Sequence, residues 1–191
     1  MLKRGWGNAR RYLQMVFINT LLMVSNNAVS SEIINFQLKL GGWSDHYISG
    51  GRSDYNFNES HEGLGFAFSG VDPQIYFLNG QNVELWYMKD SFYEDSVQLS
   101  YGLFHRYDVR FLGLKNIDLG INFVAVSRST ADINETTAKL ENKKRLHALV
   151  MMPSLSLYSH QDMHLDFVFL PAIPTVSDYS VLFFRFGFNL F

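Results

Sequence analysis

The sequence lacks cysteine altogether, so neither a disulfide framework nor a thiolate metal site is possible. It also lacks a strong charge of either sign, because 16 Lys and Arg residues oppose 18 Asp and Glu residues, for a net charge of −2. No long basic run follows the first residues, and we therefore expect no nucleic-acid partner. The scattered histidines show no spacing typical of a metal site, so neither a metal nor another cofactor is expected.

The N-terminal segment 1–30 has the features of a secretory signal peptide. A positively charged lead opens the chain, formed by Lys3, Arg4, Arg10 and Arg11. The apolar stretch 12–24 that follows is too short to span a bilayer as a helix. Small residues at 28–31 then predict cleavage after Ser30 or Ser31. The alternative is a buried amphipathic helix.

After the signal peptide the chain has no further long apolar run, and apolar and polar residues alternate instead. Residues 31–191 are enough for one domain with one interior. Bulky apolar residues alternate with small or polar ones at 34–40, 63–69, 83–88, 97–103, 117–123, 165–169 and 182–189. A further segment, 146–158, is apolar on both faces around Pro153.

Alternation with a period of two predicts strands. Together with 146–158, the seven alternating segments make eight predicted strands of about nine to eleven residues, as is typical of an all-β, eight-stranded antiparallel transmembrane β-barrel of the outer-membrane type. The alternative is a soluble lipocalin-like barrel, which would place its bulky apolar residues inside. Turn-rich segments separate the strands, at 49–56, 70–82, 128–142 and 171–178. The odd-to-even connections should face outward, since an exported barrel with an even strand number starts in the periplasm.

Small residues mark the face of two predicted strands that should point into the lumen. Gly63 and Gly65 lie on the second strand, and Gly102 lies on the fourth. The interior of an eight-stranded barrel is just wide enough for side chains to fill it. Small residues therefore leave room for a slender apolar ligand such as one acyl chain, with Trp86 and Val124 among the residues that would line it. The alternative is that large neighbouring side chains fill the same space.

Two polar groups close the first and third predicted strands. Trp-Ser-Asp-His stands at 43–46 and Lys-Asp-Ser at 89–91. Both strands rise to the same end of the barrel, so the two groups can converge. His46, Asp90 and Ser91 are the types needed to move an acyl group: a base, a carboxylate to hold the imidazole, and a hydroxyl as nucleophile or donor. The alternative is that they are polar because they meet headgroups and water.

These motifs resemble those of the PagP family, the lipid A palmitoyltransferases of the Gram-negative outer membrane. Lys-Asp-Ser-Phe at 89–92 leads at the family's spacing into Tyr101-Gly102. The Trp and His of 43–46 are similar to the end of the family's first strand. Further matches follow in the family's order over most of the mature chain, at 58–59, 63–66, 149–153, 169–171 and 184–186.

The resemblance implies an enzyme that moves a palmitoyl chain from a glycerophospholipid donor to a hydroxyl-bearing acyl chain of lipid A. It implies that His46, Asp90 and Ser91 form the catalytic trio, and that Gly102 floors the acyl pocket. We expect a monomer in the outer membrane that needs no cofactor.

Two structural features follow from the resemblance. Pro153 and Pro171 match the prolines that interrupt hydrogen bonding and open lateral gates for lipid. Strict alternation from Leu40 would place His46 outside the barrel, so its implied role requires a bulge at Gly41–Gly42.

Two other functions are compatible with the sequence. One is a non-enzymatic small outer-membrane barrel that serves adhesion or envelope integrity. The other is a lipid esterase or phospholipase, which would use the same groups with water as the acceptor.

Overall fold

The computed structural model describes residues 35–48, 51–52, 56–75, 77–134, 139–172 and 179–190. The predicted signal peptide at 1–30 lies outside the described residues. All strands belong to one compact unit, Ile33–Phe191. In the described part of the chain, no helix is long and apolar enough to cross a membrane.

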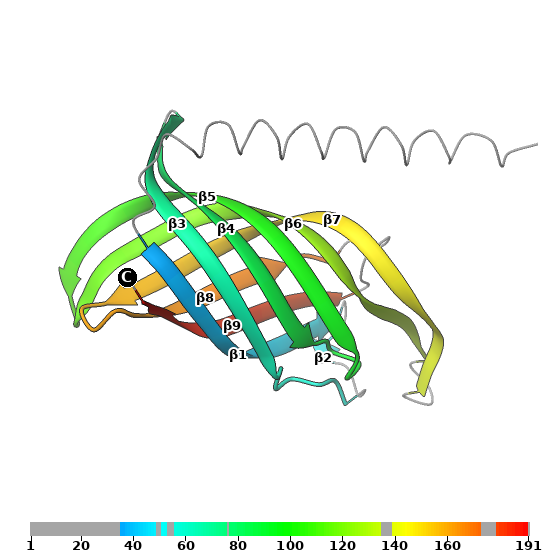
Figure 1. Ribbon diagram of the computed structural model, residues 1–191. Coiled ribbons are helices and arrows are strands. Elements are labelled where there is room, and N and C mark those ends of the chain that lie inside the picture. Colours follow the sequence, from blue (N-terminus) through cyan, green and yellow to red (C-terminus); the bar gives the residue numbers. More distant parts are fainter. Residues whose placement is uncertain are drawn as a thin grey trace, which may run out of the picture. The chain divides into compact units, whose positions relative to one another are not determined.

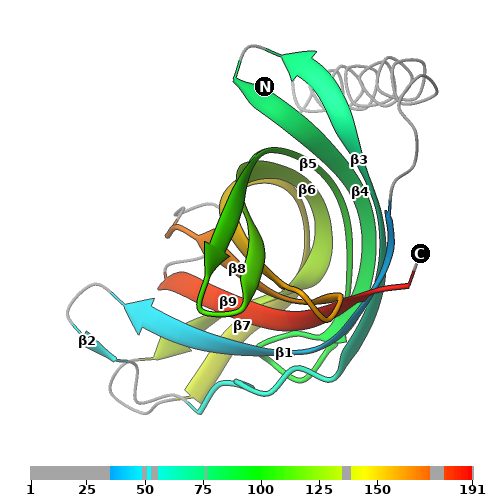
Figure 2. The same cartoon turned by 90° about the vertical axis from the view of Figure 1, so that its left-hand side faces the viewer.

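The described residues form a closed ring of antiparallel strands. The strands are β1 (Asn35–Ile48), β2 (Gly51–Arg52), β3 (Gly63–Ile75), β4 (Leu78–Lys89), β5 (Asp95–Phe111), β6 (Leu114–Asn134), β7 (Lys139–Ser159), β8 (Met163–Leu170) and β9 (Tyr179–Asn189). Their order is β2-β1-β3-β4-β5-β6-β7-β8-β9, and β1 also pairs with β9 (Figures 1 and 2). Since β2 is only a two-residue partner of β1, eight longer strands make the ring. The predicted all-β, eight-stranded antiparallel barrel is confirmed.

The outer surface of the barrel carries bulky apolar side chains. Phe66, Leu85, Phe123 and Phe186 are 40–52% exposed although they lie within strands. Polar and charged side chains are buried in the lumen instead, among them Gln37, Lys39, Glu84, Asp166 and Arg185. This distribution is the reverse of that in a soluble lipocalin-like barrel and is typical of outer-membrane barrels.

The connections differ in length at the two ends of the barrel. At one end, which we call the inner end, β5 and β6 are joined by Leu112 and Gly113, with φ angles of +51° and +76°. Positive φ at both central residues is the requirement of a two-residue type I′ turn. The opposite end, which we call the outer end, carries the connections 49–62, 90–94, 135–138 and 171–178. It therefore carries both polar motifs, as predicted.

Two of the predicted turn-rich segments are mostly strand, so this prediction was wrong for them. Segment 70–82 lies largely in the β3–β4 hairpin, and 128–142 lies largely in the β6–β7 hairpin. Pairing between β6 and β7 continues to Asn134 and Lys139. Polar side chains stabilise this ribbon across the strands, since Asn142 Nδ2 donates to Asp132 Oδ2 at 2.8 Å. Among the described side chains of this ribbon, only Ala131 is a buried apolar residue, with Leu140 packed against the same cluster, so apolar residues are too few here to give a clear alternation in the sequence.

A bulge in β1 reverses the direction in which its side chains point. The register between β1 and β9 shifts between Leu40 and Trp43, where Gly41 has a φ of +58°. As a result Leu40 and Trp43 are both exposed, whereas Ser44 and His46 are buried. The bulge that a lumenal His46 requires is therefore present.

Ladder pairing between β7 and β8 stops before the outer end. The two strands pair only from Ser154 and Val168 to Tyr158 and His164. Among the described residues, the part of β7 beyond Ser154 toward the outer end pairs with β6 alone. Pro153 directly precedes the shortened ladder on β7, and Pro171 directly follows β8. Proline has no N–H to extend a ladder, so both predicted gate prolines lie at an interruption of the barrel wall.

Candidate active site

His46 and Ser91 lie within hydrogen-bond distance of each other at the outer end of the lumen. His46 is on β1, and Ser91 is in the turn that follows β4. The distance from His46 Nε2 to Ser91 Oγ is 2.8 Å, and both side chains are buried. The structure thus brings together two of the three residues that were predicted to be catalytic.

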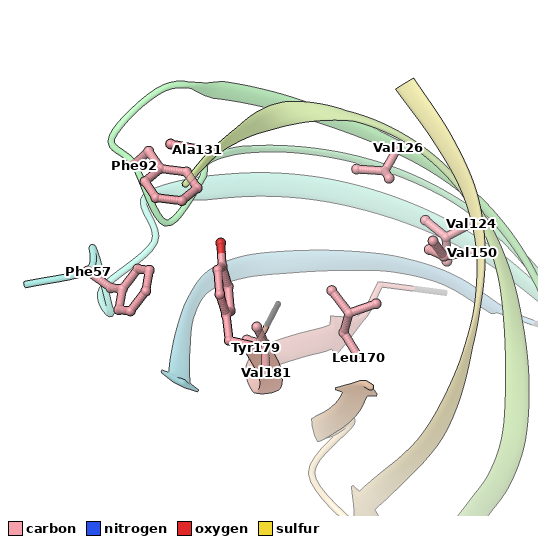
Figure 3. Close-up of a cluster of buried hydrophobic side chains, with 9 residues drawn as sticks. All are labelled: Phe57, Phe92, Val124, Val126, Ala131, Val150, Leu170, Tyr179 and Val181. Atoms are coloured by element: carbon pink, nitrogen blue, oxygen red, sulfur yellow. The ribbon is translucent and has the colours of Figure 1, made fainter. Parts of the chain in front are cut away.

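Aromatic side chains hold the His46 ring. It stacks on Phe57 with 4.1 Å between ring centroids and an interplanar angle of 8°. Tyr179, at the start of β9, lies 5.4 Å from the same ring. Figure 3 shows Phe57, Phe92 and Tyr179 grouped together at one side of the buried apolar cluster. His46 Nδ1, in contrast, has no hydrogen-bond partner among the described residues.

The carboxylate of Asp90 is hydrogen-bonded to backbone groups, and not to His46 as the predicted role would require. Its carboxylate accepts hydrogen bonds from the backbone N–H groups of Phe92, Glu94 and Ser129, at 2.9, 3.0 and 2.7 Å. These bonds occupy both carboxylate oxygens, and none of them involves His46. Asp90 therefore does not hold the imidazole. It fixes the turn that carries Ser91 and ties this turn to β6.

A second serine–histidine pair lies at the same end of the lumen and was not predicted. Ser44 Oγ is 2.7 Å from His61 Nε2, and His61 Nδ1 is 2.7 Å from the Lys89 carbonyl oxygen. His61 lies in the segment before β3, and its backbone N–H donates to the Gly42 carbonyl at 2.8 Å. Burial lowers the pKa of His61 from its ordinary value. Strand alternation carries no information about this segment, so the sequence held no signal for the pair.

A cavity of about 70 Å³ lies in the outer half of the lumen. Ser44, His61, Ser91 and Arg128 are among its polar lining residues. Its apolar wall is formed by Met88, Val124, Val126, Val150, Met152, Val168, Leu170, Val181 and Phe183. Both serines therefore line a cavity whose walls are largely apolar.

The three glycines predicted to open this space do not line it. A Cβ on Gly65 would lie 2.0 Å from the Trp86 ring, and one on Gly63 would lie 2.8 Å from the Met88 Cβ. A Cβ on Gly102 would lie 2.3 Å from the Asn82 and Asn122 Oδ1 atoms. The prediction of an open slot at Gly63, Gly65 and Gly102 was wrong, because large neighbouring side chains occupy it. The apolar wall of the cavity comes mainly from β6 to β9 instead, with Met88 from β4.

Buried ion pairs cross the lumen at the floor of the cavity. Lys39 Nζ is 2.6 Å from Asp166 Oδ2 and 3.1 Å from Glu84 Oε2. Arg185 donates through Nε to Asp166 Oδ2 at 3.0 Å and through Nη2 to Glu84 Oε2 at 2.6 Å. Glu84 and Arg185 also line the cavity. Two cations and two carboxylates thus neutralise each other and close the space below it.

The cavity meets the interrupted part of the barrel wall. Val150 and Met152 line it from β7, and Val168 and Leu170 line it from β8. These are the two strands whose ladder stops at Ser154. Pro153 and Pro171 therefore flank the cavity wall, although a passage for lipid at this point stays a prediction.

Comparison with known proteins gives no family. No model of a protein family matches the chain, and no curated protein matches it in sequence. Among solved structures, the chain is similar to Ail, the attachment invasion locus protein of Yersinia pestis, in complex with the heparin analogue sucrose octasulfate. The match covers 81% of this chain and 95% of Ail, at 12% sequence identity and a TM-score of 0.37. A similarity this distant says nothing about the site.

Proposed function

We propose that this protein is an outer-membrane acyltransferase, which moves a palmitoyl or similar chain from a glycerophospholipid to a hydroxyl group of lipid A. The observation that carries the proposal is the buried His46–Ser91 pair beside an apolar cavity. The apolar outer surface of the barrel supports a membrane location, where both lipids are at hand. The resemblance of the 43–46 and 89–92 motifs to the PagP family supports the choice of lipid A as acceptor.

Acyl transfer needs a base and a partner for the negative charge that forms on the ester carbonyl oxygen. His46 Nε2 is placed to take a hydroxyl proton, and Ser91 Oγ is within its reach at 2.8 Å. Arg128 Nη2 lies 3.4 Å from Ser91 Oγ, so its positive charge stabilises the oxyanion at this point. Asp90 is a positioning residue, because it acts only through the turn that carries Ser91.

The acyl chain of the donor occupies the apolar cavity. It enters from the membrane between β7 and β8, where no ladder bonds close the wall beyond Ser154 in the described part of the chain. The ion pairs of Glu84 and Arg185 end the cavity below, since burying a methyl terminus against charged groups is unfavourable. The depth available above this floor therefore selects the length of the chain.

Mass spectrometry of lipid A from cells with and without the protein tests the proposal. We expect lipid A to gain one acyl chain, and His46→Ala and Ser91→Ala to reduce this gain at least ~100-fold at equal amounts of folded barrel. His147→Ala is the matched control, because His147 is exposed on β7 and lies outside the site. An unchanged lipid A profile with abundant folded protein would contradict the proposal and favour a non-enzymatic barrel. Release of free fatty acid instead would identify a lipid esterase or phospholipase.

A further inference from the structure

We propose that Ser44 and His61 are a second catalytic pair, in which Ser44 Oγ is the nucleophile that carries the acyl chain and His61 is its base. The inference deepens the proposed function and rests on it for the identity of the donor, a phospholipid ester. The paired residues come from β1 and from the segment before β3.

The hydrogen bonds of His61 determine which ring nitrogen carries the proton and which can accept one from a nucleophile. The Lys89 carbonyl oxygen, 2.7 Å from His61 Nδ1, can only accept, so Nδ1 carries the proton of the neutral ring. Nε2 then has a lone pair and no proton, and Ser44 Oγ at 2.7 Å must donate to it. A hydroxyl that donates to an oriented imidazole is the arrangement that activates serine for attack on an ester.

The surroundings of the pair match this role. Ser44 and His61 are each 3% exposed, and both line the cavity that the acyl chain occupies in the proposed function. The His61 ring also contacts the Phe183 ring at 5.3 Å between centroids, which holds it at the cavity wall. Burial lowers the pKa of His61, so the ring is kept in the neutral form that accepts a proton.

The comparison with His46 shows why two pairs are useful. His46 has no described partner at Nδ1, so no hydrogen bond selects its tautomer, whereas His61 is fixed by a carbonyl. Acyl transfer consists of loading a chain and delivering it to an acceptor. The oriented pair Ser44–His61 suits covalent loading, and His46 remains available to orient the acceptor hydroxyl by a hydrogen bond.

The reaction balances without a further reactant. Ser44 Oγ bonds to the ester carbonyl carbon while its proton passes to His61 Nε2. The bond from this carbon to the lysophospholipid oxygen then breaks, and that oxygen takes the proton from His61. In the second half, a lipid A hydroxyl attacks the acyl-Ser44 ester and gives its proton to His61 Nε2. The bond from the carbonyl carbon to Ser44 Oγ breaks, and Ser44 Oγ takes this proton from His61.

Labelling with an alkyl fluorophosphonate identifies the nucleophile directly. The purified protein in detergent micelles is treated with the probe, and the modified peptide is located by mass spectrometry. We expect the label on Ser44, with a rate that falls at least ~100-fold in His61→Ala. Ser127→Ala should label as the parent protein does, because Ser127 Oγ accepts from Arg145 at the exposed surface. A label on Ser91 alone, or no label at all, would overturn the assignment.

Two further measurements separate catalysis from folding and from the proposed function. Added imidazole should restore labelling in His61→Ala, and a slow rate that imidazole leaves unchanged would mean that His61 serves only the structure. If Ser44→Ala still adds an acyl chain to lipid A at the parent rate, Ser44 is not the nucleophile although the acyltransferase stands. If Ser44 is labelled in a His61-dependent manner but lipid A stays unmodified in cells, the pair stands and the proposed acceptor is wrong.

Discussion

The outer and inner halves of the lumen are lined by the same strands but are filled in different ways. The outer half has valine, leucine and methionine walls around a cavity of about 70 Å³. The inner half holds polar and charged side chains, and the cavity found there measures only about 10 Å³. The ion pairs of Lys39, Glu84, Asp166 and Arg185 lie at the boundary between them.

The two halves also differ in the contacts that their side chains make. In the inner half, Arg106 donates to Asp118 at 2.8 and 2.7 Å, and Gln37 Nε2 donates to Tyr158 OH at 3.2 Å. Hydrogen bonds and ion pairs of this kind hold the side chains of the lumen in place. The outer half has polar contacts at its rim, such as His46–Ser91 and Ser44–His61, but its walls are apolar and it lacks part of the β7–β8 ladder. The half with the apolar cavity is the one in which we propose that the acyl chain lies.

The largest effect on stability is expected from removing one carboxylate of the ion pairs between the two halves of the lumen. Asp166→Ala should destabilise the barrel by about 3–5 kcal/mol, because it leaves two buried cations with one carboxylate. Urea unfolding in micelles, followed by tryptophan fluorescence, measures this change. Glu94→Ala is the control, since its pair with Lys143 at 2.5 Å is exposed and should contribute little. Equal unfolding midpoints for the two variants would show that the ion pairs do not stabilise the lumen.

The next effect concerns Gly102, the predicted floor of the acyl pocket. Gly102→Met should cost about 1–3 kcal/mol through overpacking, because even its Cβ would lie 2.3 Å from the amide oxygens of Asn82 and Asn122. The length of the transferred chain should not change in the protein that still folds. Mass spectrometry of the modified lipid A reads this out. A shorter added chain would restore Gly102 as the floor and move the boundary between the halves inward.

A smaller effect, on the preferred length of the acyl chain, is expected when only the cavity in the outer half is narrowed. Val150→Phe should fill part of the cavity and shift the preference toward donors with shorter acyl chains, by about tenfold for a loss of one to two buried methylenes. Leu149→Phe is the matched control, because Leu149 is the next residue on β7 and is 51% exposed. Competition between phospholipids of different chain length measures the preference. The same shift in both variants would show that the cavity does not select the chain.

Much of this architecture could be predicted from the sequence, because strand alternation reports directly which face is apolar. The ring of eight strands follows from that alternation. The meeting of His46 with Ser91 does not, because strict alternation places His46 outside the barrel; the bulge at Gly41–Gly42 was expected only because the resemblance to the PagP family implied a lumenal His46. The sequence could not show, however, whether Gly63 and Gly65 open a cavity. A glycine that leaves a hollow and a glycine that accommodates Trp86 give the same pattern in one strand.

The partners of buried polar groups were also beyond the sequence. Alternation places four charged residues on the lumenal face: Lys39, Glu84, Asp166 and Arg185. It does not give their positions along the barrel axis, which decide whether they can pair. The same holds for Asp90, whose partners include the Ser129 amide on β6. His61 lies outside the strands, so only the folded connection places it beside Ser44.

The smallest effect is expected in the pH dependence of Ser44 labelling, which reports on the pair Ser44–His61 when His46 is removed. Burial lowers the pKa of His61, and the positive charge of Arg128 on β6 lowers it further. The Lys89 carbonyl and the Asp90 carboxylate, which follows β4, act in the opposite direction and raise it. His46 on β1 also interacts with His61, so the labelling rate of Ser44 is measured as a function of pH in the variant His46→Ala. Since the pKa is lowered, the neutral base persists into more acidic solution. Labelling of Ser44 should therefore decline only below pH 6.5, the ordinary histidine value. A decline at or above this value would mean that His61 is not the buried base of Ser44.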